Sequence, residues 1–375
     1  MAYSQKELRE IMSQFTVYGD FLVAVPFGNG NVNDTYQLTY DQGGIRLHYT
    51  LQRINHQVFK EPFKVMNNVE RVTGHILNKI RADHMETKKR TLRFLYTPDG
   101  KTLVNDSRGN YWRVYVFVER ARAYEVLETP DQAFRVAEAF GEFQLQLVDL
   151  PGDRLHETIP DFHNTPKRFV DFETAVKADP CGRVKNARKE IDFLMARRAE
   201  TDTLLKLNAS GDIPERITHN DTKANNILID DLSGNGICVI DLDTVMPGLS
   251  LYDFGDMVRS GTNPAEEDET DLSKVGMRFD MYEALYRGFL KTAGLFMTSA
   301  EKEMLPFAGK LITMEIACRF LTDYLNGDTY FKIRRKEHNL DRTRNQLKLV
   351  ESIEEQFDAM HRLLKEIGPR SAARK

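Results

Sequence analysis

The sequence predicts an α+β protein of two lobes, with an antiparallel sheet in the N-terminal lobe and mostly helices in the C-terminal lobe. The chain has 375 residues, more than one hydrophobic core usually organises. Up to residue 118, short apolar runs alternate with turn sequences, as in antiparallel strands. From residue 130, apolar residues recur mainly at three- and four-residue spacing, as in helices. We therefore divide the chain into lobes of residues 1–118 and 119–375.

The composition is that of a globular protein, with 41% hydrophobic and 29% charged residues. A net charge of −4 and a pI near 6.2 argue against a polyanionic partner such as nucleic acid. The three cysteines lack the spacing of a zinc site or disulfide framework, which favours a reducing compartment. Residues 1–15 lack the apolar run of a signal peptide, and no segment has the length of a membrane span. We expect a cytoplasmic protein without a membrane partner and, because coiled-coil heptads are absent, a monomer.

The N-terminal lobe is predicted to open with an amphipathic helix over residues 5–15. Apolar runs bounded by turns predict strands over residues 21–27, 35–40, 47–55, 91–96, 101–104 and 111–118. Residues 62–80 start with Pro62 and carry apolar side chains along one face, which indicates a helix after the third strand.

The C-terminal lobe is predicted to begin with a helix over residues 131–147. Residues 159–169 are turn-rich and contain His163, a candidate substrate contact, although a loop histidine more often has no such role. Three-four spacing predicts further helices over residues 281–295, 305–325 and 340–367, which we expect to select the substrate.

Residues 216–248 are the most informative stretch of the chain. Apolar runs at 227–229 and 237–240 flank the turn-forming sequence Ser-Gly-Asn-Gly at 233–236. This arrangement indicates a β-hairpin.

Polar side chains cluster at one end of this predicted hairpin. His219, Asp221 and Asn226 precede its first strand, and Asp241 and Asp243 follow its second. Antiparallel pairing is therefore expected to bring the clusters together in one acidic, amide-rich pocket. Asp and Asn are also common turn residues, so an architectural role stays open for either cluster alone.

Phosphoryl transfer needs such groups, because metal-neutralised charge and a positioned acceptor hydroxyl stabilise its transition state. Asp241 and the amide oxygen of Asn226 can supply the oxygen ligands that Mg²⁺ prefers. Asp221, on the same loop as Asn226, is the candidate base that accepts the proton of the attacking hydroxyl. If the second strand stays extended, Asp243 faces the same side as Asp241 and either holds a second metal or serves as a structural hydrogen-bonding group.

The interval from Asp221 to Asn226, followed by Asp241 on a later strand, resembles the protein-kinase catalytic loop. The chain is similar to the kinase-related small-molecule phosphotransferases, which include aminoglycoside phosphotransferases and choline kinases. The resemblance implies a bilobal protein-kinase-like fold with ATP and Mg²⁺ as cofactors. It makes residues 1–118 the nucleotide-binding lobe and 119–375 the catalytic and substrate-binding lobe, with the Tyr-Asp-Phe-Gly-Asp run at 252–256 bracing the catalytic loop.

The same resemblance suggests where nucleotide would bind. A glycine-containing turn follows the first strand, and glycines there let backbone N–H groups approach phosphate oxygens. Gln52 or Arg53 stands where kinases carry a strand lysine, and Glu70 on the next helix is the candidate partner of that cation. The candidate nucleotide-binding residues are Gly28, Asn29, Gly30 and Asn33 in the turn, Gln52 and Arg53 on the strand, and Val118 and Glu119 at the hinge.

A narrower resemblance spans most of the chain. HNDTKANNILID, IDLDTVMPG, YDFGDMVR, HNTPKRF, CRFLTDYLNGDTYF and EHNLDRTRNQLKLV resemble the bacterial N-acetylhexosamine 1-kinases. These enzymes phosphorylate the anomeric hydroxyl of N-acetylglucosamine or N-acetylgalactosamine. The resemblance implies Arg319 and Tyr330 as sugar contacts, so the candidate substrate-binding residues are Asp221, Asp243, Arg319 and Tyr330.

Two other interpretations stay open. A kinase of the same fold can act on homoserine, an amino alcohol or an aminoglycoside, and the acidic run at 266–269 is a possible attractor for a cationic acceptor. Alternatively, the missing strand lysine suggests a nucleotide-binding regulatory protein with little turnover. The intact set of Asp221, Asn226 and Asp241 argues against the second alternative.

Overall fold

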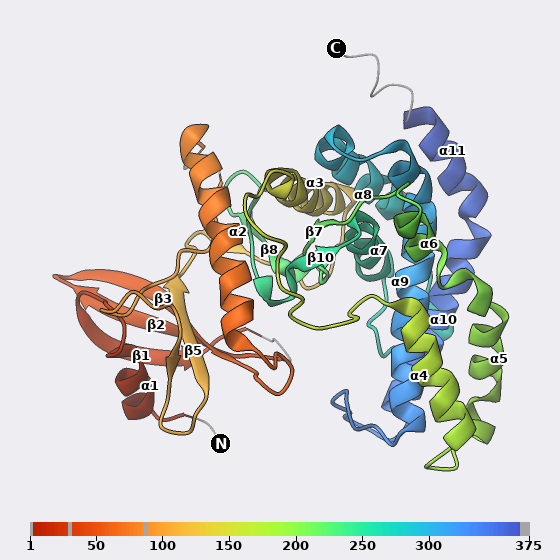
Figure 1. The fold of residues 1–375 in the computed structure, drawn as a ribbon, viewed down its shortest axis with the longest axis horizontal. Coiled ribbons are helices and arrows are strands. Elements are labelled where there is room, and N and C mark those ends of the chain that lie inside the picture. Colours follow the sequence, from red (N-terminus) through yellow and green to blue (C-terminus); the bar gives the residue numbers. More distant parts are fainter. Residues whose placement is uncertain (1–2, 29–31, 86–88, 368–375) are drawn as a thin grey trace. The chain divides into compact units, whose positions relative to one another are not determined.

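The computed structural model describes residues 3–28, 32–85 and 89–367, and the chain forms two compact units (Figure 1). The first unit consists of Met1–Arg122, Leu150–Pro160 and Leu228–Met246. The second unit consists of Ala123–Asp149, Asp161–Ile227 and Pro247–Lys375. An antiparallel sheet dominates the first unit and helices dominate the second, which confirms the predicted fold class.

The main sheet of the first unit has the strand order β1-β2-β3-β5-β4, and every neighbouring pair is antiparallel. Its register places Gln52 of β3 opposite Arg113 of β5. The strands are β1 (Asp20–Pro26), β2 (Asp34–Gln42), β3 (Ile45–Ile54), β4 (Val104–Asn105) and β5 (Tyr111–Val116).

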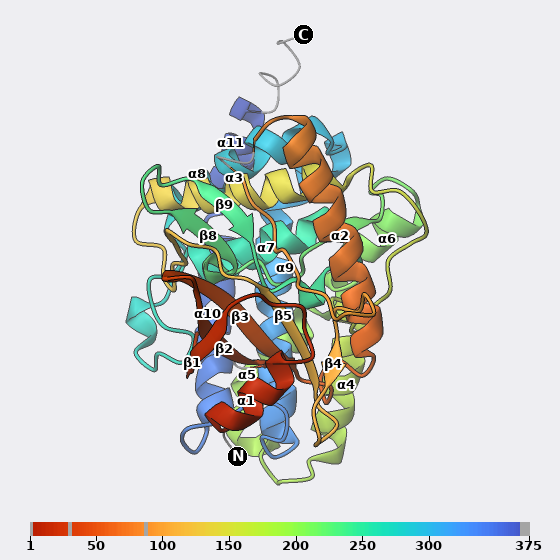
Figure 2. The same cartoon turned by 90° about the vertical axis from the view of Figure 1, so that its left-hand side faces the viewer.

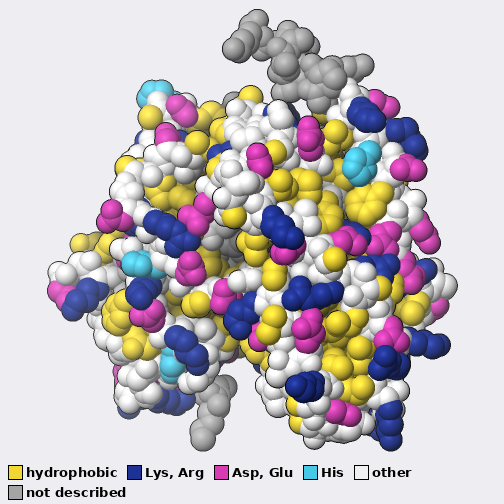
Figure 3. Space-filling model, turned by 45° about the vertical axis from the view of Figure 1, so that its right-hand side comes forward, with side chains coloured by type: hydrophobic (Ala, Val, Ile, Leu, Met, Phe, Trp, Pro, Cys, Tyr) yellow, Lys and Arg dark blue, Asp and Glu magenta, His cyan; other side chains and the backbone are white. Residues whose placement is uncertain are grey.

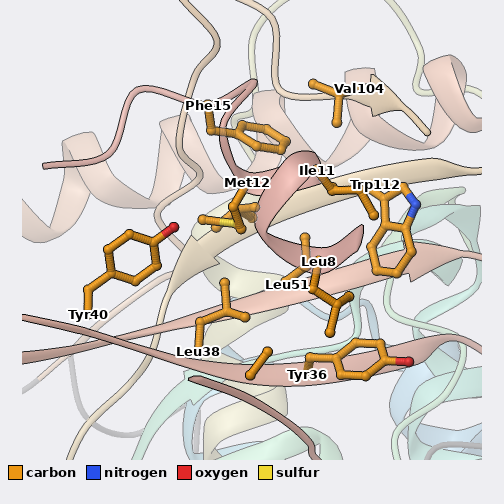
Figure 4. Packing of buried hydrophobic residues seen from close by; sticks show 12 residues of the cluster. Leu8, Ile11, Met12, Phe15, Tyr36, Leu38, Tyr40, Leu51, Val104 and Trp112 are labelled. Carbon is orange, nitrogen blue, oxygen red and sulfur yellow. The ribbon is translucent and has the colours of Figure 1, made fainter. Parts of the chain in front are cut away.

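Helix α1 (Gln5–Met12) packs on one face of this sheet (Figure 2). Ser4 and Glu7 form a capping box that starts the helix. Figure 4 shows Leu8, Met12 and other α1 side chains gathered with Trp112 and apolar residues of the strands. Fully burying one such large side chain contributes roughly 1.5–3 kcal/mol, so this cluster fixes the helix to the sheet.

The predicted hairpin is confirmed in a second, three-stranded sheet of order β6-β8-β9. Its strands are β6 (Ala121–Arg122), β8 (Ile227–Asp230) and β9 (Gly236–Val239). The 3-10 helix η4 (Leu242–Thr244) follows this hairpin, and α2 (Pro62–Ala82) packs against it. The short strand β6 was not expected from the sequence.

The second unit is built around α9, which contacts α4, α7 and α10 (Figure 1). Helices α3 and α8 pack against each other, and β7 (Arg216–Thr218) pairs with β10 (Met246–Gly248). The α-helices are α3 (Pro130–Leu147), α4 (Thr165–Ala178), α5 (Arg188–Ala196), α6 (Thr203–Ala209), α7 (Ser250–Gly261), α8 (Phe279–Thr292), α9 (Ser299–Leu325), α10 (His338–Glu355) and α11 (Phe357–Ile367). The 3-10 helices are η1 (Val184–Ala187), η2 (Arg198–Glu200), η3 (Ala224–Asn226), η5 (Leu272–Lys274) and η6 (Ala293–Leu295).

Two sequence-based predictions of local structure were wrong in part. Residues 91–96 and 101–104 form only the single bridge of Phe94 with Tyr115 and the two-residue β4, because the apolar pattern there reflects burial of Leu92 and Leu103 rather than a strand ladder. The insertion at 159–169 is a loop only up to Asn164. Its side chain caps α4 by accepting a hydrogen bond from Lys167 N, and a proline in the first turn favours the helix.

Charged side chains of both signs lie interspersed on the face of the molecule shown in Figure 3. Within the described ranges, none of the helices has the length and hydropathy needed to span a bilayer.

Candidate functional site

The predicted catalytic loop, residues 219–226, lies in the second unit and is held by two aspartates of α7. Asp253 accepts hydrogen bonds from the backbone nitrogens of His219 (2.9 Å) and Asn220 (2.7 Å). Asp256 accepts one from the nitrogen of Thr222 (2.9 Å). All five residues are buried, so the loop is braced by charge-assisted hydrogen bonds away from solvent. The predicted brace is thereby confirmed.

The glycine between these aspartates has a packing role. A Cβ atom added to Gly255 would lie 2.5 Å from the carbonyl oxygen of Ala308 on α9. The absence of a side chain therefore lets α7 approach α9 closely, which fixes the helix that carries the brace.

Asp221 and Asn226 lie together within this loop, as expected. Asn226 Nδ2 donates to the carbonyl oxygen of Asp221 (2.8 Å) and to its Oδ2 (3.2 Å). On the other side, Lys223 Nζ lies 3.0 Å from Asp221 Oδ1. Lys223 was not predicted from the sequence, although its place two residues after the candidate base was a usable signal.

The charges around Asp221 keep its carboxyl group ionised. Burial raises the pKa of Asp221, but electrostatic interactions with Lys223, His219 and Arg259 oppose this, and the net pKa lies below its ordinary value. The carboxylate is therefore deprotonated at neutral pH, as a general base must be.

Asp241 and Asp243 lie in the first unit, at the end of the hairpin. Asp241 has φ 55°, a left-handed conformation that is uncommon outside glycine, and the next residues turn at once into η4. The segment is therefore not extended, so the condition under which the two carboxylates were expected to face the same side is not met. Asp241 is exposed, whereas only 1% of the Asp243 residue is accessible.

A buried arginine that the sequence did not single out binds Asp243. Arg113 Nη1 donates to Asp243 Oδ1 at 2.5 Å, and its Nε donates to Gln52 Oε1 at 3.0 Å. Asn33 Nδ2 donates to Asp243 Oδ2 at 2.8 Å. Two predicted nucleotide-binding residues, Asn33 and Gln52, thus converge on one buried ion pair. Arg113 on β5 is therefore the cation beside Gln52. The kinase resemblance places a lysine on the neighbouring strand, β3.

Arg53 and Glu70, which were expected to pair with each other near the nucleotide, bind other residues. Arg53 Nε donates to Asp34 Oδ2 at 2.7 Å, so its guanidinium belongs to an ion pair across the β2–β3 ladder. Glu70 accepts a hydrogen bond from the Thr102 hydroxyl rather than pairing with a strand cation. The interpretation of Glu70 as that partner was therefore wrong.

The remaining predicted nucleotide-binding residues lie on the turn after β1 and in the segment after β5. Gly28 has φ 78°, which suits glycine, and Val118 is half-buried. Glu119 Oε1 lies 2.6 Å from His48 Nδ1. Asn29 and Gly30 lie outside the described residues.

Arg319 and Tyr330, the predicted sugar contacts, lie together in the second unit. The Arg319 guanidinium carbon is 5.9 Å from the Tyr330 ring centre, 5.6 Å from Phe162 and 5.7 Å from Phe331. Arg319 is half-buried, and Tyr330 is 64% exposed. Three aromatic rings therefore surround one cation.

Comparison with protein families identifies the group to which the chain belongs. A family model described as the phosphotransferase enzyme family matches residues 23–285. The match covers more than half of the chain and includes the catalytic loop, its α7 brace and the hairpin. The chain belongs to the phosphotransferase enzyme family.

Solved structures with a similar fold include phosphotransferases and a kinase. An aminoglycoside phosphotransferase from Alicyclobacillus acidocaldarius subsp. acidocaldarius DSM 446 is 13% identical, with a TM-score of 0.61 over 96% of each chain. A spectinomycin phosphotransferase in complex with ADP and spectinomycin is 15% identical, with a TM-score of 0.55 over 94% of this chain and 99% of that one. An ethanolamine kinase from Plasmodium vivax is 13% identical, with a TM-score of 0.53 over 87% and 82%. These similarities confirm the protein-kinase-like fold of this phosphotransferase.

The donor atoms of this phosphotransferase suit Mg²⁺. No group of three or more His, Cys, Asp or Glu side chains converges on a metal site within the described ranges. Mg²⁺ in kinases needs only one or two protein carboxylates together with phosphate oxygens. Asn226 uses its amide nitrogen toward Asp221, so its amide oxygen points elsewhere, and Asp241 presents an exposed carboxylate. Both are hard oxygen donors, which fits the predicted metal.

Proposed function

We propose that this phosphotransferase is an ATP- and Mg²⁺-dependent kinase that phosphorylates the anomeric (C1) hydroxyl of an N-acetylhexosamine, N-acetylglucosamine or N-acetylgalactosamine. Asp221 is its catalytic base, and Arg319 and Tyr330 contact the sugar. The sugar 1-phosphate and ADP are the products. Three cysteines that form no disulfide support a cytoplasmic location.

The state of the Arg319 guanidinium carries the proposal. Among the residues that the structure describes, Arg319 makes no hydrogen bond or ion pair; its guanidinium lies over three aromatic rings, and its charge acts on Glu315 one turn earlier. Its five N–H donors are therefore available to a ligand. The ring hydroxyls and the acetamido carbonyl of an N-acetylhexosamine supply acceptor oxygens, and the exposed Tyr330 ring offers an apolar face for the sugar.

The same region is unsuited to a cationic acceptor. A fixed positive charge occupies the centre of the aromatic group, where a choline-type site would need room for the ligand's own cation. Three of the four acids in the run at 266–269 also form ion pairs with basic residues of the chain: Glu267 with Arg259, Asp268 with Arg335, and Glu269 with Lys274. These contacts favour a neutral acceptor over an aminoglycoside, choline or ethanolamine.

The proposed reaction is a direct transfer. The anomeric hydroxyl loses its proton to Asp221 while its oxygen forms a bond to the γ-phosphorus of ATP. The bond from that phosphorus to the β,γ-bridging oxygen breaks, and ADP leaves. Asn226 holds Asp221 through two hydrogen bonds, and Lys223 keeps it ionised, so the base stays oriented and deprotonated before the acceptor arrives.

The cofactors follow from the family and from the donor groups. The fold is similar to that of a spectinomycin phosphotransferase solved with ADP, which supports ATP as the phosphoryl donor. Asn226 and Asp241 would hold Mg²⁺, and the ion would neutralise charge on the phosphate oxygens. Asn33 and Gln52 support the nucleotide side of the site through the buried Arg113–Asp243 pair rather than through direct phosphate contact.

Phosphorus NMR tests this function. The purified protein is incubated with Mg-ATP and, in separate samples, N-acetylglucosamine, N-acetylgalactosamine, homoserine, choline and an aminoglycoside. We expect a sugar 1-phosphate signal that disappears when EDTA replaces Mg²⁺, and no product from choline or the aminoglycoside. Product from a cationic acceptor alone would refute the sugar assignment. Nucleotide binding without product from any acceptor would support a regulatory protein instead.

A carboxylate-bearing acceptor such as homoserine is the second candidate. An unpartnered arginine is also a good carboxylate ligand, because its planar fork can donate two parallel hydrogen bonds. An Arg319→Lys variant separates the two candidates. Lysine keeps a positive charge but loses the fork, so a carboxylate acceptor keeps part of its affinity, whereas a neutral sugar loses most of its planar hydrogen bonds.

A further inference from the structure

A buried His–Glu pair lies next to the catalytic loop in the second unit. His163 Nδ1 is 2.9 Å from Glu315 Oε1, and the two side chains are 5% and 0% exposed. The hydroxyl of Thr165 donates to the other carboxylate oxygen of Glu315 at 2.6 Å. Glu315 is thus fully engaged without solvent. The mechanism proposed above uses none of these three side chains.

The opposite edge of the imidazole faces the backbone of the catalytic loop. His163 Nε2 lies 3.3 Å from the carbonyl oxygen of Asn220, the residue immediately before Asp221. Asn220 has φ 66°, a conformation that costs energy outside glycine and persists only when the surroundings hold it. Asp253 holds its nitrogen and His163 contacts its carbonyl, so the strained residue is held from both sides.

Acceptor oxygens lie at both edges of the His163 ring. A backbone carbonyl can only accept a hydrogen bond, and so can an ionised carboxylate. Burial raises the pKa of Glu315, but its interaction and hydrogen bond with His163, together with the hydrogen bond from Thr165, lower it overall, so the carboxylate is ionised. The His163 ring therefore bridges the Glu315 carboxylate and the carbonyl of Asn220.

The same segment also touches the proposed acceptor site. Phe162 packs edge-on against His163 with ring centres 4.7 Å apart, and it lies 5.6 Å from the Arg319 guanidinium. Arg319 follows Glu315 by one turn of α9. Two adjacent residues of one loop thus make these contacts: Phe162 contacts Arg319, and His163 contacts the carbonyl oxygen of Asn220.

We infer that His163, held by Glu315, is a positioning residue for Asp221: it fixes the strained peptide that aims the base at the acceptor hydroxyl. This inference rests on the proposed role of Asp221. It assigns a function to the HNTPKRF insertion that neither the catalytic loop nor the metal ligands explain. Loss of the contact should reduce the rate of transfer without reducing nucleotide binding, because only the orientation of the base changes.

The test compares His163→Phe, Glu315→Gln and the double variant in steady-state kinetics with the acceptor that NMR identifies. His163→Phe keeps a buried ring but removes both ring nitrogens, and we expect kcat to fall about 10- to 100-fold, since small misplacements of catalytic groups have effects of this size. KM for ATP and for the acceptor should change less than about twofold under that mechanism. The double variant should be no slower than His163→Phe, because Glu315 acts through His163.

Phe169→Leu is the matched control, since Phe169 is fully buried in the helix that follows His163 and its ring packs edge-on against Phe172. It should lower Tm while kcat per folded molecule stays unchanged. If His163→Phe fails to fold, Glu315→Gln alone decides, because its shape is unchanged and only its charge is lost. Unchanged kcat in the folded variants, or equal loss in Phe169→Leu, would overturn the positioning role. Loss of activity in Asp221→Asn with full activity in His163→Phe would leave the proposed function standing and refute this inference alone.

Discussion

Arg113 and Asp243 form an ion pair inside the first unit, with only 3% and 1% of their side chains exposed. Gln52 accepts from the guanidinium and Asn33 donates to the carboxylate, so both charges have further hydrogen bonds. The negative charge raises the pKa of Arg113 against the effect of burial, and Asp241 contributes to this shift. The pair therefore links the β3–β5 ladder to the segment that carries the proposed metal ligand.

Removing the arginine should destabilise the first unit. In Arg113→Met the Asp243 carboxylate stays buried without its partner, which typically costs about 3–5 kcal/mol. Trp112 is the only tryptophan of the chain and is buried in the core of the same unit. Its fluorescence during urea denaturation therefore reports the unfolding free energy of this unit directly.

Arg53→Met is the control for that measurement. Arg53 pairs with Asp34 on the same sheet, but the two side chains are 25% and 50% exposed. An exposed pair contributes at most about 1 kcal/mol. Equal destabilisation by both variants would show that the buried pair has no special weight. Recovery of stability in Arg113→Met/Asp243→Asn would show that the cost comes from the unpaired charge.

Local patterns in the sequence were sufficient for most of the fold. The hairpin was predicted from its Ser-Gly-Asn-Gly turn, and α2 from its proline and apolar face, because these signals act within a few residues. The chain around Phe94 was predicted as a strand and is not one, since apolar residues can be buried without a ladder partner. The structure of this segment depends on contacts with residues distant in the sequence.

The candidate site also contains residues that local sequence could predict and residues that it could not. Asp221 and Asn226 could be predicted because both belong to one short loop, and they indeed contact each other. Arg113 could not, since an arginine within a strand ordinarily lies at the surface and its partner is 130 residues away. The orientation of Asp243 was also beyond the sequence, because it depends on the left-handed conformation of Asp241.

Replacing the proposed base should separate chemistry from binding. In Asp221→Asn we expect kcat to fall roughly 10²–10⁴-fold, the usual contribution of general base catalysis. Nucleotide affinity, measured by calorimetry without acceptor, should stay nearly unchanged, because the base acts in the transition state. A variant that kept its turnover would remove Asp221 from this role.

The pH dependence of transfer should depend on Lys223. The pKa of Asp221 lies below its ordinary value, so the base remains ionised as pH falls and activity is lost only at strongly acidic pH. In Lys223→Met the largest lowering contribution disappears, and burial then raises the pKa. The acid limb of the kcat profile should therefore move to higher pH.

The lowered pKa of Asp221 should also make the stability of the protein depend on pH. A carboxyl whose pKa is depressed in the folded state stabilises the protein above its unfolded pKa, and this contribution is lost as pH falls through the folded value. Lys167→Met is the control, because Lys167 forms an exposed ion pair with Asp171 on α4 rather than with Asp221. An acid limb that stayed in place in Lys223→Met, or moved equally in Lys167→Met, would contradict the assignment.

Asp323 should control affinity for the acceptor through the loop that carries Tyr330. Its buried carboxylate accepts hydrogen bonds from three consecutive backbone nitrogens, those of Thr329 (2.9 Å), Tyr330 (2.8 Å) and Phe331 (2.9 Å). The exposed aromatic side chain beside Arg319 is thus held from α9 through its own backbone. A ligand that binds to Tyr330 would otherwise have to order the loop first, and that entropy would weaken binding.

In Asp323→Ala these hydrogen bonds are lost, and we expect KM for the acceptor to rise about 10-fold, in line with the loss of charge-assisted hydrogen bonds of about 1.5–3 kcal/mol. KM for ATP should not change, because the loop has no proposed contact with nucleotide. Glu303→Gln serves as a control, since Glu303 is an exposed acid on the same helix. If acceptor and ATP constants changed together, Asp323 would be stabilising the unit as a whole. If only the acceptor constant changed, the preformed position of Tyr330 would be part of how this phosphotransferase selects its substrate.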